Sequence, residues 1–261
     1  MQVIAQDNQV SLPHKPHKKL RVELAISEAD IRASQRLRYQ IFAEEMGAHL
    51  PSAAEKLDRD HYDPYCQHML VKDTLSGEVI GSTRILSEYQ ARKAGGFYSE
   101  SEFDLSRLLP LQGHVIEIGR TCIHPQYRKG RALSLLWAAL AKYMDKNRVD
   151  YLFGCASIPM HDGGYQAHSI MDELRNMHLA DEAYRVNPAL TLPEVNEIPA
   201  RIVSMPPLLK AYLRLGLKVC GEACWDPDFN VADVFVLLDR KQIDPRYVRH
   251  YMDRKHAGLS A

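Results

Sequence analysis

One segment of this chain, a predicted strand, turn and helix over residues 115–136, constrains its fold more than any other. Apolar residues surround Glu117 and Arg120 in the first part, which indicates a largely buried strand. A His-Pro dipeptide ends it, and a short polar turn leads into an amphipathic helix over residues 132–146. A helix that starts after a basic, glycine-containing turn presents free backbone N–H groups, so the turn is a candidate phosphate site. A buried strand, a surface loop and a core helix without any ligand would show the same pattern.

Composition narrows the class of protein. The chain has 261 residues, of which 46% are hydrophobic and 25% charged, as in a globular protein with one large domain. Its formal net charge is zero, so no overall field favours nucleic acid, and attraction to an anionic partner must be local. No apolar run is long enough to cross a bilayer, and residues 1–16 lack the apolar core of a secretory signal. The five scattered cysteines indicate reduced thiols of a cytoplasmic protein, and their spacing predicts no metal site.

The chain divides into three predicted parts. Residues 1–19 form a flexible basic arm, which is either solvated or rests on an anionic membrane. Residues 20–240 form the main domain, with an insertion at 157–206, and residues 241–261 a C-terminal helix and tail. Within the main domain we expect strands at 20–26, 67–72, 79–87, 115–122 and 151–156, helices at 27–46, 132–146, 162–179 and 207–215, and a final hairpin of 217–225 with 231–239. This order predicts an α/β fold with a mixed twisted sheet and flanking helices.

The order of elements resembles the GNAT acyltransferase fold. In that family the fourth strand and the turn after it bind the pantetheine arm and pyrophosphate of an acyl-coenzyme A. Residues 125–132 match this turn but are one residue short, so they suit a single phosphate better than a pyrophosphate. The resemblance implies that the donor's phosphopantetheine contacts Arg128, Lys129, Gly130 and Arg131.

Four spaced elements are similar to the GNAT branch that takes acyl chains from acyl carrier protein. Acyl-homoserine-lactone synthases have Arg-x-x-x-Phe in the first helix, an acidic pair, an Arg on the third strand, and Glu-x-Ser/Thr-Arg on the fourth. This chain has, in the same order, Arg38-x-x-x-Phe42, Asp60-x-x-Asp63, Arg84 and Glu117-Ile118-Gly119-Arg120. Gly119 replaces the hydroxyl residue, which argues against a lactone synthase. The IEIGR segment and the extra C-terminal third resemble instead the ornithine lipid N-acyltransferases.

That resemblance implies an N-acyltransferase that moves a 3-hydroxyfatty acyl chain from acyl carrier protein to the α-amine of L-ornithine or another amino acid, giving lyso-ornithine lipid. It implies no metal or redox cofactor. The zero net charge gives no reason to expect a nucleic acid partner, and peripheral contact of the basic N-terminal arm with the inner membrane is the alternative to a solvated arm. The alternatives are an N-acyl amino acid or acyl-homoserine-lactone-type signal synthase, and a non-catalytic module that binds the acyl carrier.

Roles follow for the matched residues. Glu117 and Arg120 are the catalytic candidates: desolvation of a carboxylate in an apolar strand should raise its pKa and make Glu117 a useful base. A structural ion pair between the two is the alternative, and it needs a bulge because residues three apart on a flat strand face opposite ways. Guanidinium groups match carboxylates, so the arginines would bind the acceptor's carboxylate or anchor the acidic loop. The aspartates would pair with them or hold a second ammonium group of the acceptor. These substrate-binding candidates are Arg38, Arg84, Asp58, Asp60 and Asp63.

Overall fold

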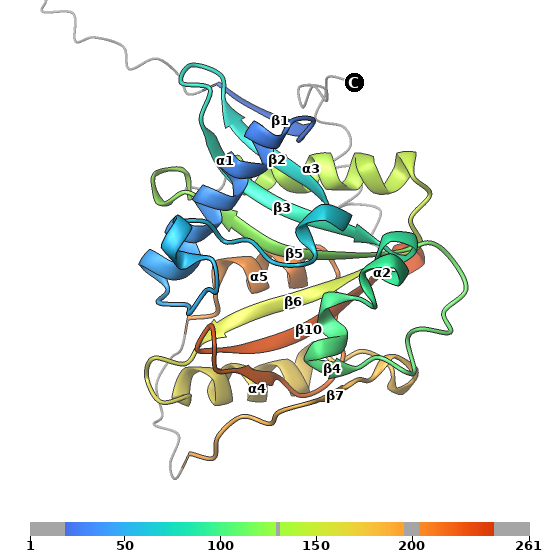
Figure 1. Cartoon of the computed structure of the whole chain (residues 1–261). Helices are drawn as coiled ribbons and strands as arrows, with labels where there is room; N and C mark the ends of the chain where they lie inside the picture. The colour runs from blue at the N-terminus through green and yellow to red at the C-terminus, as the bar shows by residue number, and fades with distance from the viewer. Residues whose placement is uncertain (1–18, 129–130, 196–203, 243–261) are drawn as a thin grey trace, which may run out of the picture.

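The computed structural model of the chain describes residues 19–128, 131–195 and 204–242. Its strands form one large mixed sheet in the order β1-β2-β3-β5-β6-β10-β8, and β9 also pairs with β10 (Figure 1). All neighbours are antiparallel except β5 and β6. The strands of this sheet are β1 (Leu20–Leu24), β2 (Gln67–Asp73), β3 (Val79–Ser87), β5 (Val115–Ile123), β6 (Tyr151–Pro159), β8 (Lys218–Val219), β9 (Cys224–Asp226) and β10 (Val231–Asp239), and a separate pair is β4 (Phe103–Asp104) with β7 (Asn187–Pro188).

Helices cover both faces of the sheet. In Figure 1, α1 and α2 lie in front of it and α3 lies behind. The largest core joins the sheet to α3, α4 and α5 through residues such as Leu136, Ile170 and Leu209. None of the helices in the described part of the chain is long and apolar enough to cross a membrane. The helices are α1 (Glu28–Tyr39), α2 (Glu88–Ala94), α3 (Arg131–Lys146), α4 (Tyr165–Met177) and α5 (Pro207–Arg214), with a π-helical segment at Gln40–Glu45 and 3-10 turns at Ala53–Glu55, Asp63–Tyr65, Tyr98–Ser101, Pro125–Tyr127, Glu182–Tyr184 and Arg240–Gln242.

The first helix forms for the reasons that the sequence indicates. Ser27 caps α1, because its hydroxyl oxygen accepts a hydrogen bond from the backbone N–H of Asp30, and acidic residues occupy the first turn. Its buried side chains include Leu37 and Arg38, so this helix carries a cation into the protein interior. The predicted mixed sheet and its central strand, turn and helix are confirmed.

β5 and β6 separate along their length. They pair only over Val115–Glu117 and Tyr151–Phe153, and beyond these residues the two strands diverge (Figure 1). Where they part, a Cβ on Gly154 would lie 2.2 Å from the carbonyl oxygen of Ile118, so only glycine fits there. The divergence divides the sheet into two halves and leaves backbone groups of β5 without a strand partner on one side.

One predicted element is wrong. The segment 217–225 is not a single strand of a hairpin: β8 and β9 are two short strands with a turn between them. Gly221 has a φ of +143°, and a Cβ there would lie 2.5 Å from the carbonyl oxygen of Val186. The chain therefore bends at Gly221 instead of continuing along β10. The predicted C-terminal helix and almost all of the N-terminal arm lie outside the described residues.

Gly154→Ala should lower the free energy of unfolding by about 1–3 kcal/mol, because the added methyl group overlaps a backbone carbonyl that cannot move without shifting β5. Urea unfolding measures this change. Gly119→Ala on β5 is the matched control: nothing lies within 4 Å of its Cβ position, so its stability should be unchanged. Equal stability of the two variants would contradict the close contact of the strands.

Candidate active site

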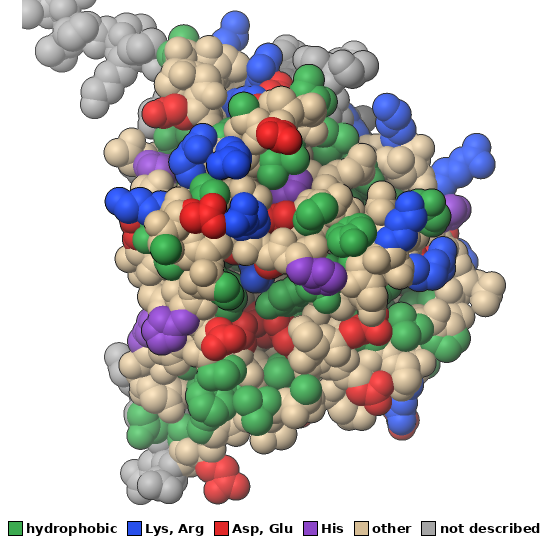
Figure 2. All heavy atoms as spheres, in the orientation of Figure 1, with side chains coloured by type: hydrophobic (Ala, Val, Ile, Leu, Met, Phe, Trp, Pro, Cys, Tyr) green, Lys and Arg blue, Asp and Glu red, His purple; other side chains and the backbone are tan. Residues whose placement is uncertain are grey.

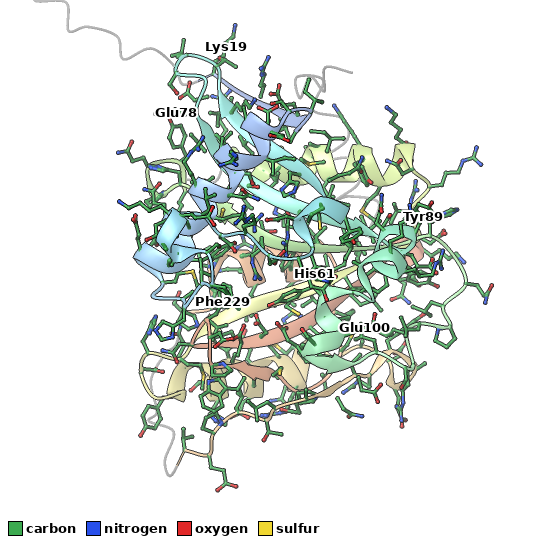
Figure 3. All side chains as sticks on the ribbon, viewed as in Figure 1. Lys19, His61, Glu78, Tyr89, Glu100 and Phe229 are labelled. Carbon is green, nitrogen blue, oxygen red and sulfur yellow. The ribbon has the colours of Figure 1, made fainter. Side chains whose placement is uncertain are left out.

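The separation of β5 and β6 opens into a pocket of about 80 Å³. A single water needs about 10–15 Å³ on this measure, so the pocket can take a small polar group. Its wall contains charged residues of both signs, Glu117, Arg84, Arg120 and Asp233 among them, together with the rings of Tyr62, Tyr98 and Phe229. Figure 3 labels Phe229 and His61 on the near side of the sheet, in the region between its two halves. The pocket is therefore polar, partly aromatic and placed where the sheet divides.

A β-bulge on β5 places both catalytic candidates in this pocket. The register between β3 and β5 shifts between Ser82 and Arg84, and Arg120 has a φ of +52°. Glu117 and Arg120 consequently both line the pocket, although they are three residues apart on one strand. The expected alternative, an ion pair between them, is wrong, because among the described residues Glu117 has other partners.

Glu117 is buried and held by hydrogen bonds from one short turn. The backbone N–H groups of Tyr98 and Ser99 each donate to its carboxylate at 2.8 Å, and the hydroxyl of Ser99 donates to it as well. Burial raises the pKa of Glu117, and the bonds from Ser99 lower it in part. The carboxylate is thus fixed in position with a pKa above its ordinary value, as a general base requires.

The predicted arginines and aspartates meet in one buried network, the Arg–Asp cluster (Arg38, Arg84, Arg120, Asp58, Asp60 and Asp63). Arg38 lies 2.8 Å from Asp58 and 2.7 Å from Asp63. Arg84 lies 3.0 Å from Asp63 and also pairs with Asp60, and Arg120 lies 3.3 Å from Asp58. Of the two roles expected for the aspartates, the structure shows pairing with the arginines. The other expected role, holding an ammonium group of the acceptor, stays a prediction, and the Oδ2 of Asp60 makes no hydrogen bond within the described residues.

The cluster joins four separate parts of the chain. Arg38 comes from α1, Arg84 from β3 and Arg120 from β5, while the aspartates come from the loop between α1 and β2. Burial alone would raise the pKa of Asp63, but Arg38 and Arg84 outweigh it and hold that pKa well below its ordinary value. The guanidinium of Arg120 also lies over the rings of Tyr98 and Phe229, 4.9 and 4.5 Å from their centres.

The pocket contains two thiols, and neither is a suitable nucleophile. Burial raises the pKa of Cys66 to about 12 and that of Cys155 well above its ordinary value. Both thiols therefore stay protonated at neutral pH, and a protonated thiol is a poor nucleophile. Neither thiol in this pocket is therefore suited to form an acyl-enzyme.

The predicted phosphate turn is described only in part. Lys129 and Gly130 lie outside the described residues, and Arg131 begins α3. Arg128 donates through Nε to the carbonyl of Ile123 at 2.9 Å and pairs with Glu45 on the π-helical segment. Their contact with a donor stays a prediction.

Sequence reasoning missed a second charged group beside the pocket, which we call the acidic group (Glu102, Asp226 and Asp233). One carboxylate oxygen from each lies within 4.8 Å of the others. The sequence did contain a sign of Asp233, which is the only charged residue inside the apolar segment VADVFVLL and is therefore expected to be buried. Glu102 and Asp226 had none, because only the fold brings these distant segments together. Ser99, which orients Glu117, was missed for the same reason.

Comparison with known proteins agrees with this geometry. Residues 37–138 match the family model described as an acetyltransferase (GNAT) domain. The L-ornithine N(alpha)-acyltransferases of Brucella abortus and Agrobacterium fabrum are each 36% identical to this chain, over 89% of it and over 88% and 85% of their own lengths. The chain belongs to this family. It is therefore an acyltransferase, as the spaced motif predicts.

Solved structures show the same fold at low sequence identity. FeeM, an N-acyl amino acid synthase, superimposes with a TM-score of 0.52 at 11% identity, covering 87% of this chain and 93% of its own. BjaI, a CoA-dependent acyl-homoserine lactone synthase, superimposes with a TM-score of 0.52 at 13% identity, covering 93% of this chain and 92% of its own. These similarities confirm the GNAT architecture of this family member.

The Arg–Asp cluster should be essential for stability. Asp63→Ala leaves the buried guanidiniums of Arg38 and Arg84 short of a partner, so the free energy of unfolding should fall by about 3–5 kcal/mol. Glu55→Ala in the same loop removes only an exposed ion pair with Arg59 and should cost at most about 1 kcal/mol. Denaturant unfolding of both variants tests this. A similar loss of unfolding free energy in both variants would show that the buried ion pairs contribute little to stability.

Asp233 should make stability depend on pH. Burial raises its pKa to about 6 from an ordinary 3.8, so the folded state retains a proton that the unfolded state releases. This contribution is complete below about pH 4 and is lost as the pH rises through 6, a difference on the order of 3 kcal/mol. Asp233→Asn should therefore lose less stability than the wild type between pH 4.5 and 7.5, as measured by urea unfolding. An equal change in the free energy of unfolding with pH in both proteins would contradict a raised pKa of Asp233.

Proposed function

We propose that this chain transfers a 3-hydroxyfatty acyl group from acyl carrier protein to the α-amine of L-ornithine, giving lyso-ornithine lipid. The observation that carries the proposal is the buried Glu117 in the gap between β5 and β6, beside guanidiniums that match an amino acid's carboxylate. The names of the relatives support ornithine as the acceptor.

The donor would lie along the gap. Beyond Glu117, the edge of β5 that faces β6 is free of a parallel partner, and such backbone groups can bond to the amides of a pantetheine arm. Arg128, Lys129 and Arg131 are the proposed contacts for its single phosphate and for the acidic carrier protein. The thioester arrives already activated, so the proposal includes no resident metal or redox cofactor.

The reaction would then be one direct substitution. Glu117, or a water held by it, takes a proton from the α-ammonium, and the neutral amine attacks the thioester carbonyl. The tetrahedral intermediate then loses a second N–H proton and collapses to an amide. The carrier's thiolate leaves and takes up one of the two released protons, and the other passes to solvent. Arg84 and Arg120 would bind the acceptor's carboxylate, and the Nε of Arg84 is a buried donor that makes no hydrogen bond within the described residues. A peripheral contact of the basic N-terminal arm with the inner membrane, at its cytoplasmic face, is part of the same proposal.

Glu117→Gln keeps the shape of the side chain but cannot take a proton, so kcat should fall by about 10²–10⁴-fold while the protein stays folded. The assay follows ornithine acylation by purified protein with 3-hydroxyacyl carrier protein and with the matching coenzyme A ester, and mass spectrometry detects lyso-ornithine lipid in a host that expresses each variant. We expect product from the wild type with the carrier protein donor. An unchanged rate in the variant would remove Glu117 from the mechanism, and a preference for the coenzyme A ester would contradict the donor.

A further inference from the structure

The acidic group places three carboxyl groups close together next to the pocket. Asp226 ends β9 and Asp233 lies on β10, and both line the pocket on the half of the sheet opposite the Arg–Asp cluster. Glu102 follows the turn that holds Glu117 and adds its carboxylate within 4.8 Å of the other two. On the near face of the molecule, Figure 2 shows acidic side chains below a central hollow.

Glu102 provides the second observation that points to a ligand. The residue is only 7% exposed, and neither of its buried carboxyl oxygens has a hydrogen-bond partner of ordinary geometry within the described residues, although the side chains of Tyr98 and Cys155 lie near it. Such carboxylates are rare, because burial without a donor is costly. Asp233 accepts one bond, from the hydroxyl of Ser157 at 2.7 Å, and Asp226 accepts bonds from two backbone N–H groups. The donors available in the protein therefore leave this group under-bonded.

The charges around the acidic group indicate the kind of ligand that would suit it. Each of the three guanidiniums of the Arg–Asp cluster lies beside a carboxylate, and the Nε of Arg84 remains a donor without a hydrogen-bond partner within the described residues. The acidic group has no such ion-pair partner in the part of the chain that the structure describes. A cation that carries N–H donors would supply both the charge and the hydrogen bonds.

We propose that Glu102, Asp226 and Asp233 form the subsite for the side-chain ammonium of a diamino acid acceptor. An ammonium group carries three N–H donors, and at bond lengths of about 2.8 Å its acceptors lie about 4.6 Å apart, which fits oxygens within 4.8 Å of one another. The acceptor's carboxylate then faces Arg84 and Arg120, and its α-amine faces Glu117. This inference rests on the proposed function and adds the residues that select ornithine.

The test compares two acceptors that differ only in the side-chain amine: ornithine and norvaline. The variants are Glu102→Gln and Asp233→Asn, and Glu100→Gln is the control, since Glu100 is exposed two residues away and its bond from the backbone N–H of Phe97 survives in glutamine. In Glu102→Gln and Asp233→Asn, kcat/KM for ornithine should fall about 10- to 100-fold, the effect of losing a hydrogen bond to a charged group. The kcat/KM for norvaline should fall far less, and Glu100→Gln should have the kcat/KM of the wild type with both acceptors.

Thermal unfolding gives a readout that does not need turnover. Saturating ornithine should raise the Tm of the wild type and of Glu100→Gln, and norvaline should raise it less. In Glu102→Gln, ornithine and norvaline should raise the Tm by the same amount. Without ligand, Glu102→Gln should be about as stable as the wild type, because burial and the neighbouring Asp233 raise the pKa of Glu102 and its neutral form resembles glutamine.

Other outcomes would overturn the proposal. An equal loss with ornithine and norvaline would make the acidic group structural. Loss of activity in a chelator, restored by Mg²⁺ or Mn²⁺, would make it a metal site instead. If the wild type acylates no amino acid, the proposed function fails, and the Tm comparison still decides whether the acidic group binds a side-chain ammonium.

Discussion

The buried guanidinium of Arg38 must be neutralised before this active site can exist. It is fully inaccessible to solvent, and a charge in that position is tolerated only with close, hydrogen-bonded partners. Asp58 and Asp63 supply them, and in doing so they draw the loop between α1 and β2 against the sheet. That loop also brings Tyr62 to the pocket wall. The buried ion pairs of Arg38 therefore also build one side of the site.

Two backbone irregularities complete the site. The bulge at Arg120 turns its side chain to the same side as Glu117, and the close approach at Gly154 marks where β6 leaves β5. A regular sheet would put Glu117 and Arg120 on opposite faces and would close the gap between the strands. The geometry of the pocket thus depends on departures from ideal strand structure.

The sequence predicted the parts of the molecule that depend on local patterns. The strand, turn and helix after residue 115, the cap of α1 at Ser27 and the meeting of Arg38 with the acidic loop all follow from periodicity, capping chemistry or spaced motifs. It did not predict Ser99, Glu102 or Asp226, because each reaches the site only through tertiary folding. The split of the last hairpin was missed because its cause, the carbonyl of Val186 beside Gly221, is a contact between distant segments.

The arrangement of charges also offers a reason why one amine of a diamino acid would react and the other would not. Amines attack only as the neutral base, and an α-amine, with an ordinary pKa of about 8, loses its proton more easily than a side-chain amine at about 10.4. Carboxylates at the acidic group would stabilise the side-chain ammonium and raise its pKa further. Glu117 lines the same pocket as Arg84 and Arg120, the arginines that would hold the carboxylate and hence the adjacent α-carbon. In this arrangement the subsite that selects ornithine also keeps its second amine charged and unreactive, so that acylation is directed to the α-position.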